Sequence, residues 1–229
     1  MAEPTPEPAE LGAMFEALEA QLEAPVGLAE GLRQRSTWAR SAALLGVALA
    51  MVTVISLGLR RVDLALHPLP RLLGTLAALA AAVLAAGLVV LRPVHRRRLS
   101  GWWVALVAGA AVLAPAIVSS LPAAHADHPA SVIGVGADLV PRALGCFAFG
   151  LGFALTAVAA AYLLERSALR RRGPAVLALL GAGALGNLVL VLHCPIVAPI
   201  HQWAGHATVS LVLLVAAVVA VSWRSLGRG

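Results

Sequence analysis

The chain has 229 residues, of which 60% are hydrophobic and 12% are charged, and its mean hydropathy is +0.89. This composition excludes an ordinary soluble domain and is typical of an all-α membrane protein with several spans. All 17 basic residues are arginines, and the formal net charge is +6. Because the arginines lie in short clusters between apolar runs, they indicate membrane topology, and we expect no direct binding of nucleic acid.

The first 38 residues differ in composition from the rest of the chain, because residues 1–30 carry seven glutamates and no basic residue. Apolar side chains recur there at helical spacing with glutamates on the other faces, which predicts a short amphipathic helix ended by Pro25 and Gly27. The apolar positions are Leu11, Met14, Phe15, Leu18 and Leu22, and the glutamates are Glu16, Glu19 and Glu23. The acidity argues against adsorption to anionic lipid. Two interpretations remain: a docking helix for a basic soluble partner, or a segment that packs on the membrane domain or stays disordered.

Residues 39–229 contain six apolar segments, each long enough to span a lipid bilayer as a helix. The segments cover approximately residues 40–59, 72–91, 101–121, 143–164, 174–193 and 204–223. Small residues are frequent in them, as in close helix packing, and we expect Asn187 to form an interhelical hydrogen bond. The sequence therefore predicts a bundle of six transmembrane helices, preceded by the cytoplasmic segment of residues 1–38.

The arginines are distributed unequally between the two sides that these spans define. Thirteen fall on one side, namely Arg33, Arg35, Arg40, Arg92, Arg96, Arg97, Arg98, Arg166, Arg170, Arg171, Arg172, Arg224 and Arg228. The other side has Arg60, Arg61, Arg71 and Arg142. Because basic residues are retained on the cytoplasmic side, we expect both termini inside the cell. The five tryptophans lie at expected span ends, as interfacial aromatic residues do.

A short interruption between the last two apolar runs, residues 192–206, concentrates reactive side chains at the expected outer face. Its candidate metal ligands are His193, Cys194, His201 and His206, with His125 and His128 of the longest outer loop as further candidates. Thiol and imidazole groups are ligands for zinc or copper, although these spacings match no compact C-x-x-C or H-E-x-x-H pattern. The alternative is that the histidines are interfacial polar residues that bond loop carbonyl groups. No cofactor is predicted.

The two cysteines of the chain, Cys146 and Cys194, lie at equal distances of 24 residues on either side of Arg170, near the centre of a cytoplasmic turn. In an antiparallel helix pair, equal separation from the turn means equal depth in the membrane. A disulfide additionally needs the two side chains to face each other, with Cα atoms within about 7 Å. The cysteines therefore have two interpretations: a pair of sensor or structural thiols at the outer face, or two small buried residues.

Several motifs in residues 142–226 resemble one family. A cysteine at the start of a span, Arg-Arg-Arg-Gly-Pro at Arg170 to Pro174, a span rich in Gly and Ala, and Leu-His-Cys-Pro at Leu192 to Pro195 are similar to the NrsF-like (negative regulator of sigma F) family of six-span membrane proteins. Myxobacterial CarR-like anti-sigma factors are similar in layout. The chain departs from the family at Ile196 and Val197, where family members often carry acidic residues.

The resemblance implies an anti-sigma factor of the bacterial inner membrane, which would regulate transcription in signal transduction and stress response. By this likeness Cys146 and Cys194 match the paired cysteines of the family. The segment of residues 1–38 matches the part that binds an extracytoplasmic-function sigma factor. The alternative function is a metal-handling or small-solute transport protein that uses the outer His and Cys residues. We do not expect an enzyme, because the four acids outside the N-terminal segment assemble into no catalytic motif.

Overall fold

A computed structural model of the chain describes residues 12–13, 15–16, 27–61, 63–64, 67–92, 100–120 and 139–226, and every regular element in these ranges is helical. The elements are α2 (Leu28–Gln34), α3 (Thr37–Gly58), α4 (Leu69–Val90), α5 (Gly101–Ser120), α7 (Leu139–Leu169), α8 (Arg172–His193), α9 (Pro199–His201), the π-helix η2 (Gln202–Ala207) and α10 (Thr208–Leu226). The expected all-α fold is thereby confirmed for the described residues.

Within the described residues, six helical stretches are long and apolar enough to cross a membrane, as the sequence predicted. The first five are α3, α4, α5, the part of α7 from Leu139 to Arg166, and α8, and the sixth runs from Pro199 to Ala220 through α9, η2 and α10. The sixth begins five residues earlier than expected, because Pro199 occupies the first helical turn, where a missing N–H costs nothing. The chain is a multi-pass membrane protein by length and composition of its helices.

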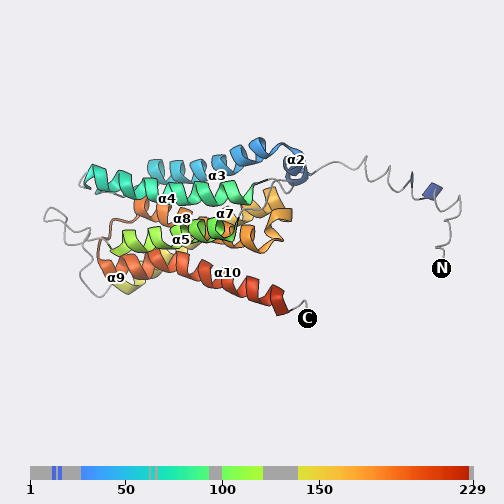
Figure 1. Ribbon diagram of the computed structural model, residues 1–229. Helices are drawn as coiled ribbons and strands as arrows, with labels where there is room; N and C mark the ends of the chain where they lie inside the picture. The colour runs from blue at the N-terminus through green and yellow to red at the C-terminus, as the bar shows by residue number, and fades with distance from the viewer. Residues whose placement is uncertain are drawn as a thin grey trace.

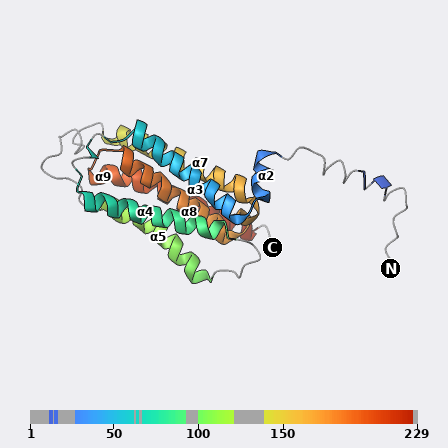
Figure 2. The ribbon, with the colours of Figure 1, turned by 90° about the horizontal axis from the view of Figure 1, so that it is seen from above.

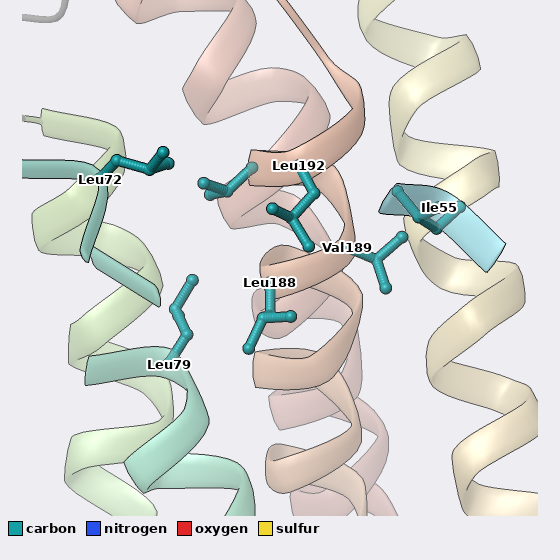
Figure 3. Packing of buried hydrophobic residues seen from close by; sticks show 7 residues of the cluster. Ile55, Leu72, Leu79, Leu188, Val189 and Leu192 are labelled. Atoms are coloured by element: carbon teal, nitrogen blue, oxygen red, sulfur yellow. The ribbon is translucent and has the colours of Figure 1, made fainter. Parts of the chain in front are cut away.

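Helix α8 lies at the centre of the bundle and contacts α3, α4, α5, α7 and α10 (Figures 1 and 2). In its most apolar stretch 78% of the residues are buried, against 39% or less in each of the other five spans. Figure 3 shows how Leu188, Val189 and Leu192 of α8 pack between Ile55 of α3 and Leu72 and Leu79 of α4. The outer helices present large apolar side chains outward, and all five tryptophans are exposed near helix ends. This surface suits a lipid environment.

Close approach of α7 to α8 depends on two glycines that face each other. A Cβ atom at Gly186 would lie 2.6 Å from the carbonyl oxygen of Gly150, and one at Gly150 would lie 2.5 Å from Leu190 Cδ1. Between helices in lipid, where burial of apolar surface contributes little to association, such small-residue contacts provide the packing.

Helix α8 is also joined to α10 by a polar contact. Asn187 donates to Ser210 Oγ of α10 at 3.0 Å and to Gly183 O at 2.9 Å, which confirms the expected interhelical hydrogen bond.

The two ends of the bundle carry different elements. Helix α2 and the last turns of α10 lie at one end, here called the α2 end, and α9 lies at the opposite α9 end (Figure 1). Helix α2, which was not expected, begins after Gly27 and contacts α7. Of the N-terminal candidate residues, Phe15 and Glu16 are helical and exposed. The remaining N-terminal and loop candidates lie outside the described residues, namely Leu11, Met14, Leu18, Glu19, Leu22, Glu23, His125 and His128.

Candidate functional site

Four potential metal ligands meet at the α9 end, and we call Cys146, Cys194, His201 and His206 the thiol-imidazole cluster. One ligand atom from each residue lies within 4.8 Å of those of the other three. The Cys146 and Cys194 sulfurs are 3.3 Å apart, and the Cys194 sulfur lies 3.2 Å from His201 Nε2. Cys194, His201 and His206 are buried and Cys146 is half-buried. Elements distant in the sequence thus bring together two thiols and two imidazoles in the protein interior.

The cysteines lie on α7 and directly after α8. Cys194 ends α8 because Pro195 follows it, and a residue before proline avoids the helical conformation. Its N–H still donates to Leu190 O at 2.8 Å, which keeps the sulfur beside the last turn of the helix. Both cysteines are free thiols at the same depth of the bundle, as the spacing around Arg170 predicted. Their facing orientation depends on the glycine contact between α7 and α8, which the sequence alone did not reveal.

The histidines of the cluster are positioned by the π-helix η2. In an α-helix, residues five apart point in directions that differ by about 140°. In a π-helix the i to i+5 backbone bonding brings such residues to one side of the helix. His201 and His206 therefore have ring centroids only 5.7 Å apart, with the rings at 70°. Thr208 supports this turn, because its hydroxyl donates to Trp203 O at 2.9 Å.

Gly205 allows η2 to pack directly against α7 beside Cys146. A Cβ atom at this position would lie 3.0 Å from Ala143 O and 3.2 Å from Cys146 Cβ. Any side chain there would push η2, and with it His206, away from the cysteine. The motif Gly205-His206, which stood out in the sequence, is thus explained by close packing and by placement of an imidazole.

A buried ion pair holds the segment that carries Cys194. Arg61 donates to both carboxylate oxygens of Asp63, at 2.6 Å each, and both side chains are almost fully buried. The backbone N–H of Arg61 also donates to Leu192 O at 2.9 Å, and its guanidinium contacts the carbonyl oxygens of Val191 and Pro195. Arg61 had been interpreted only as a topology signal. The signal that could have identified it is the acid two residues later, since an arginine buried in a membrane protein needs a partner.

His193 does not belong to the cluster, which corrects the metal-ligand set predicted from the sequence. Its Nδ1 lies 2.6 Å from Leu59 O, and its ring stacks on Phe149 at a centroid distance of 4.3 Å. Adjacent residues at a helix end point about 100° apart, so His193 and Cys194 cannot both face the same site. Cys146 takes its place. The alternative interpretation, a histidine bonded to a loop carbonyl, fits His193 but not the buried His201 and His206.

The environment of Cys194 favours its neutral thiol form. Two causes raise the pKa of the Cys194 thiol: contact with the Cys146 sulfur, which has the larger effect, and burial. His206 is 2% exposed, and its Nε2 has no hydrogen-bond partner in the described part of the chain. The arrangement is chemically suited to two events: oxidation of the two thiols to a disulfide, or replacement of their protons by a thiophilic cation.

Comparisons of the chain with protein-family models, with curated proteins and with solved structures find no match in any of the three. The resemblance to the NrsF-like family therefore rests on the motifs in residues 142–226. The functional inference has to be drawn from these motifs and from the geometry of the site.

Proposed function

We propose that this chain is an integral membrane anti-sigma factor of the bacterial inner membrane, which senses a chemical signal at the α9 end. The observation that carries the proposal is the meeting of two thiols, one half-buried and one buried, from residues 48 positions apart at the end of the bundle opposite α2. A paired thiol site is a suitable input for a signal, since its oxidation or ligation changes the packing of two helices. The motifs around Cys146 and Cys194 resemble those of the NrsF-like family, and this resemblance also supports the proposal.

The charge distribution supports an orientation with the α2 end in the cytoplasm. Described arginines of the α2 end include Arg33, Arg35, Arg40, Arg92, Arg166, Arg170, Arg171 and Arg172. The α9 end carries Arg60, Arg61, Arg71 and Arg142, and Asp63 neutralises Arg61. By the positive-inside rule the N-terminal segment then faces the cytosol, where a sigma factor is available.

Helix α7 links the thiol site to the N-terminal segment. Its outer part carries Cys146, and near its other end Arg33 of α2 donates to Leu163 O at 2.8 Å. Two residues after Leu163, Glu165 has a non-helical backbone, with φ −145° and ψ 55°, and pairs with Arg40 of α3. From Cys146 to Leu163 the helix measures about 26 Å at 1.5 Å per residue. A shift of α7 at the thiols would therefore move the docking position of α2 and change the presentation of residues 1–27.

The sigma-binding surface in this proposal is the acidic amphipathic segment. Its apolar anchors are Leu11, Met14, Phe15, Leu18 and Leu22, with Glu16, Glu19 and Glu23 as electrostatic complement. The side chain of Phe15 is 66% exposed, so it is accessible to a partner. Sigma factors use basic surfaces to contact DNA, and an acidic helix with an apolar face competes for such a surface.

The test is capture of a sigma factor from the host cytosol by the full-length protein in detergent. The variant F15E/L18E places charge on the apolar face, and A13E/A20E adds the same charge on the opposite face as a control. We expect the native protein and the control to capture the sigma factor, and F15E/L18E to lose it and to cause constitutive expression of the target genes. Equal capture by all three proteins would contradict the proposal.

A metal-handling function is the second candidate, and the thiol-imidazole cluster is the observation that favours it. Binding of a cation and its transport are separate properties, because transport needs a polar route through the bundle. In the middle of the bundle, the side chains of Asn187 and Ser210 bond each other, and α8 is otherwise packed among apolar side chains. Uptake of the cation into vesicles that contain the purified protein would distinguish transport from binding.

A further inference from the structure

We propose that the thiol-imidazole cluster is a four-ligand site for a thiophilic divalent cation, with zinc as its natural occupant and Cys146, Cys194, His201 and His206 as ligands. The site goes beyond the proposed function, because it needs no partner protein. Two thiolates and two imidazoles are a recurrent ligand set of tetrahedral zinc sites. The ligands come from α7, the end of α8, α9 and η2, so a bound cation would join three of the six spans.

The distances suit a tetrahedral cation. With zinc–sulfur bonds of about 2.3 Å and zinc–nitrogen bonds of about 2.0–2.1 Å, neighbouring ligand atoms lie about 3.3–3.8 Å apart. In the cluster the sulfur–sulfur distance is 3.3 Å, the distance from the Cys194 sulfur to His201 Nε2 is 3.2 Å, and all pairs lie within 4.8 Å. Shifts of about 1 Å or less, within the reach of side-chain rotation, therefore complete the coordination sphere.

The charge balance selects a divalent ion. Binding displaces the two thiol protons to solvent, and the resulting two thiolates neutralise a 2+ charge while the imidazoles stay neutral. A neutral complex is what a buried site tolerates, because an unpaired charge in an apolar interior is costly. Arg61 adds no net charge nearby, because Asp63 pairs with it. A monovalent cation would leave the same site with a net negative charge.

The surroundings hold the ligands in place. Ile196 and Val197 are 6% and 2% exposed, so the segment next to Cys194 is packed in an apolar environment. The Arg61–Asp63 pair holds the carbonyl groups on both sides of Cys194, and Gly205 keeps η2 against α7. The buried ring of His206 has an unpartnered nitrogen in the described part of the chain, and a ligand bond would give this ring a strong partner.

The experiment is titration of the reduced, full-length protein in detergent with Co2+, a spectroscopic substitute for zinc. We expect one equivalent to bind with the visible bands of tetrahedral cobalt and the charge-transfer bands of cobalt thiolate, and added Zn2+ to displace it. Zinc content of the protein as purified is measured in parallel. Absence of Co2+ binding, or a cobalt spectrum without thiolate bands, would overturn the proposal.

The variants separate ligands from neighbours. H193Q is the matched control, because His193 adjoins Cys194 in sequence but bonds Leu59 O instead of joining the cluster. We expect H193Q to bind as the native protein does. C146S and H206Q each remove a ligand atom. Loss of a group that only orients a ligand typically lowers metal affinity about 10- to 100-fold, so we expect these two variants to bind Co2+ more weakly by at least that factor. An equal loss in H193Q and C146S would contradict the ligand assignment.

A second measurement uses only the native protein, so it does not depend on whether the variants fold correctly. Mild oxidation of the native protein with diamide forms a disulfide between Cys146 and Cys194 and reduces diamide to the hydrazine, with no change in sequence. The oxidised protein should lose Co2+ binding, and dithiothreitol should restore it. Retained binding in the oxidised protein would overturn the proposal. Sigma-factor capture, measured on the same samples, reports separately on the proposed function.

Discussion

The two ends of this bundle are built on different physical principles. At the α9 end, polar and reactive groups point inward, and Arg61, Asp63 and the thiol-imidazole cluster are buried among apolar side chains. At the α2 end, Arg33, Arg166 and Arg170 line an open cavity of about 240 Å³ together with the Arg40–Glu165 pair, so arginines outnumber the acid in its lining. The closed end suits chemistry that needs a dry, fixed geometry, whereas the open end suits electrostatic contact with water, headgroups or a soluble partner.

With two such different ends, one small membrane protein can receive a signal at one end and bind its partner at the other. Burial at the α9 end makes the site selective, because only a neutral complex or an uncharged disulfide fits there. Exposure at the α2 end makes contacts weaker and easier to rearrange. Helix α7 belongs to both ends, since it carries Cys146 and also the Leu163 carbonyl that α2 binds. Three substitutions test this contrast between the two ends.

The largest effect is expected from Asp63→Asn at the closed end. The substitution removes the partner of a buried guanidinium, and breaking a buried pair in this way costs about 3–5 kcal/mol. We expect a large loss of thermal stability of the purified protein in detergent, measured by unfolding curves. Arg60→Gln, at the exposed neighbouring arginine, is the control and should leave the unfolding temperature nearly unchanged. Similar stability of both variants would show that the α9 end is not a closed, charge-paired interior.

An intermediate effect is expected from Gly186→Ala, which acts on the distance between α7 and α8. The new Cβ atom would lie 2.6 Å from the backbone oxygen of Gly150, so the helices have to separate. Overpacking of this kind costs about 1–3 kcal/mol. We expect slower formation of the Cys146–Cys194 disulfide under diamide, measured by thiol alkylation, together with reduced stability. Gly152→Ala is the control, because its Cβ atom would meet nothing within 4 Å; equal oxidation rates in the two variants would argue against glycine-controlled facing of the thiols.

The smallest effect is expected from Arg33→Gln at the open end. It removes a partly exposed hydrogen bond between α2 and Leu163 O, a loss of about 1 kcal/mol. We expect partial derepression of the sigma-dependent genes, measured with a reporter, and unchanged Co2+ affinity. Arg35→Gln, at an exposed arginine of the same turn, should leave the reporter at its native level. A changed Co2+ affinity in Arg33→Gln would show that the two ends are not separated as described.

Much of the fold was predictable because the strongest signals are local. A run of about 20 apolar residues forms a helix in lipid whatever its neighbours are, since every backbone polar group must be satisfied within the segment. The number of spans and their approximate bounds followed from hydropathy and segment length, and the equal depth of Cys146 and Cys194 followed from their equal separation from Arg170. The interhelical role of Asn187 was also predictable, since a polar amide among apolar residues needs a partner on another helix.

The candidate site was only half predictable, because the directions of its side chains depend on contacts between distant segments. Cys194, His201 and His206 were identified from their concentration in one stretch, but the structure places His193 apart from them and brings Cys146, which was not connected to the histidines, beside them. The rotation of α8 against α7 is decided by Gly150 and Gly186. The π-helix η2, which aligns two histidines five residues apart, leaves no periodic pattern in the sequence.

Hydropathy and segment length act within each helix, so they already predict a bundle of apolar helices with both cysteines at one level. Which side chains meet at that level depends on how the helices pack. Helix rotation, the π-turn and the buried Arg61–Asp63 pair result from packing between segments far apart in the chain, where one glycine or one ion pair changes which groups face each other.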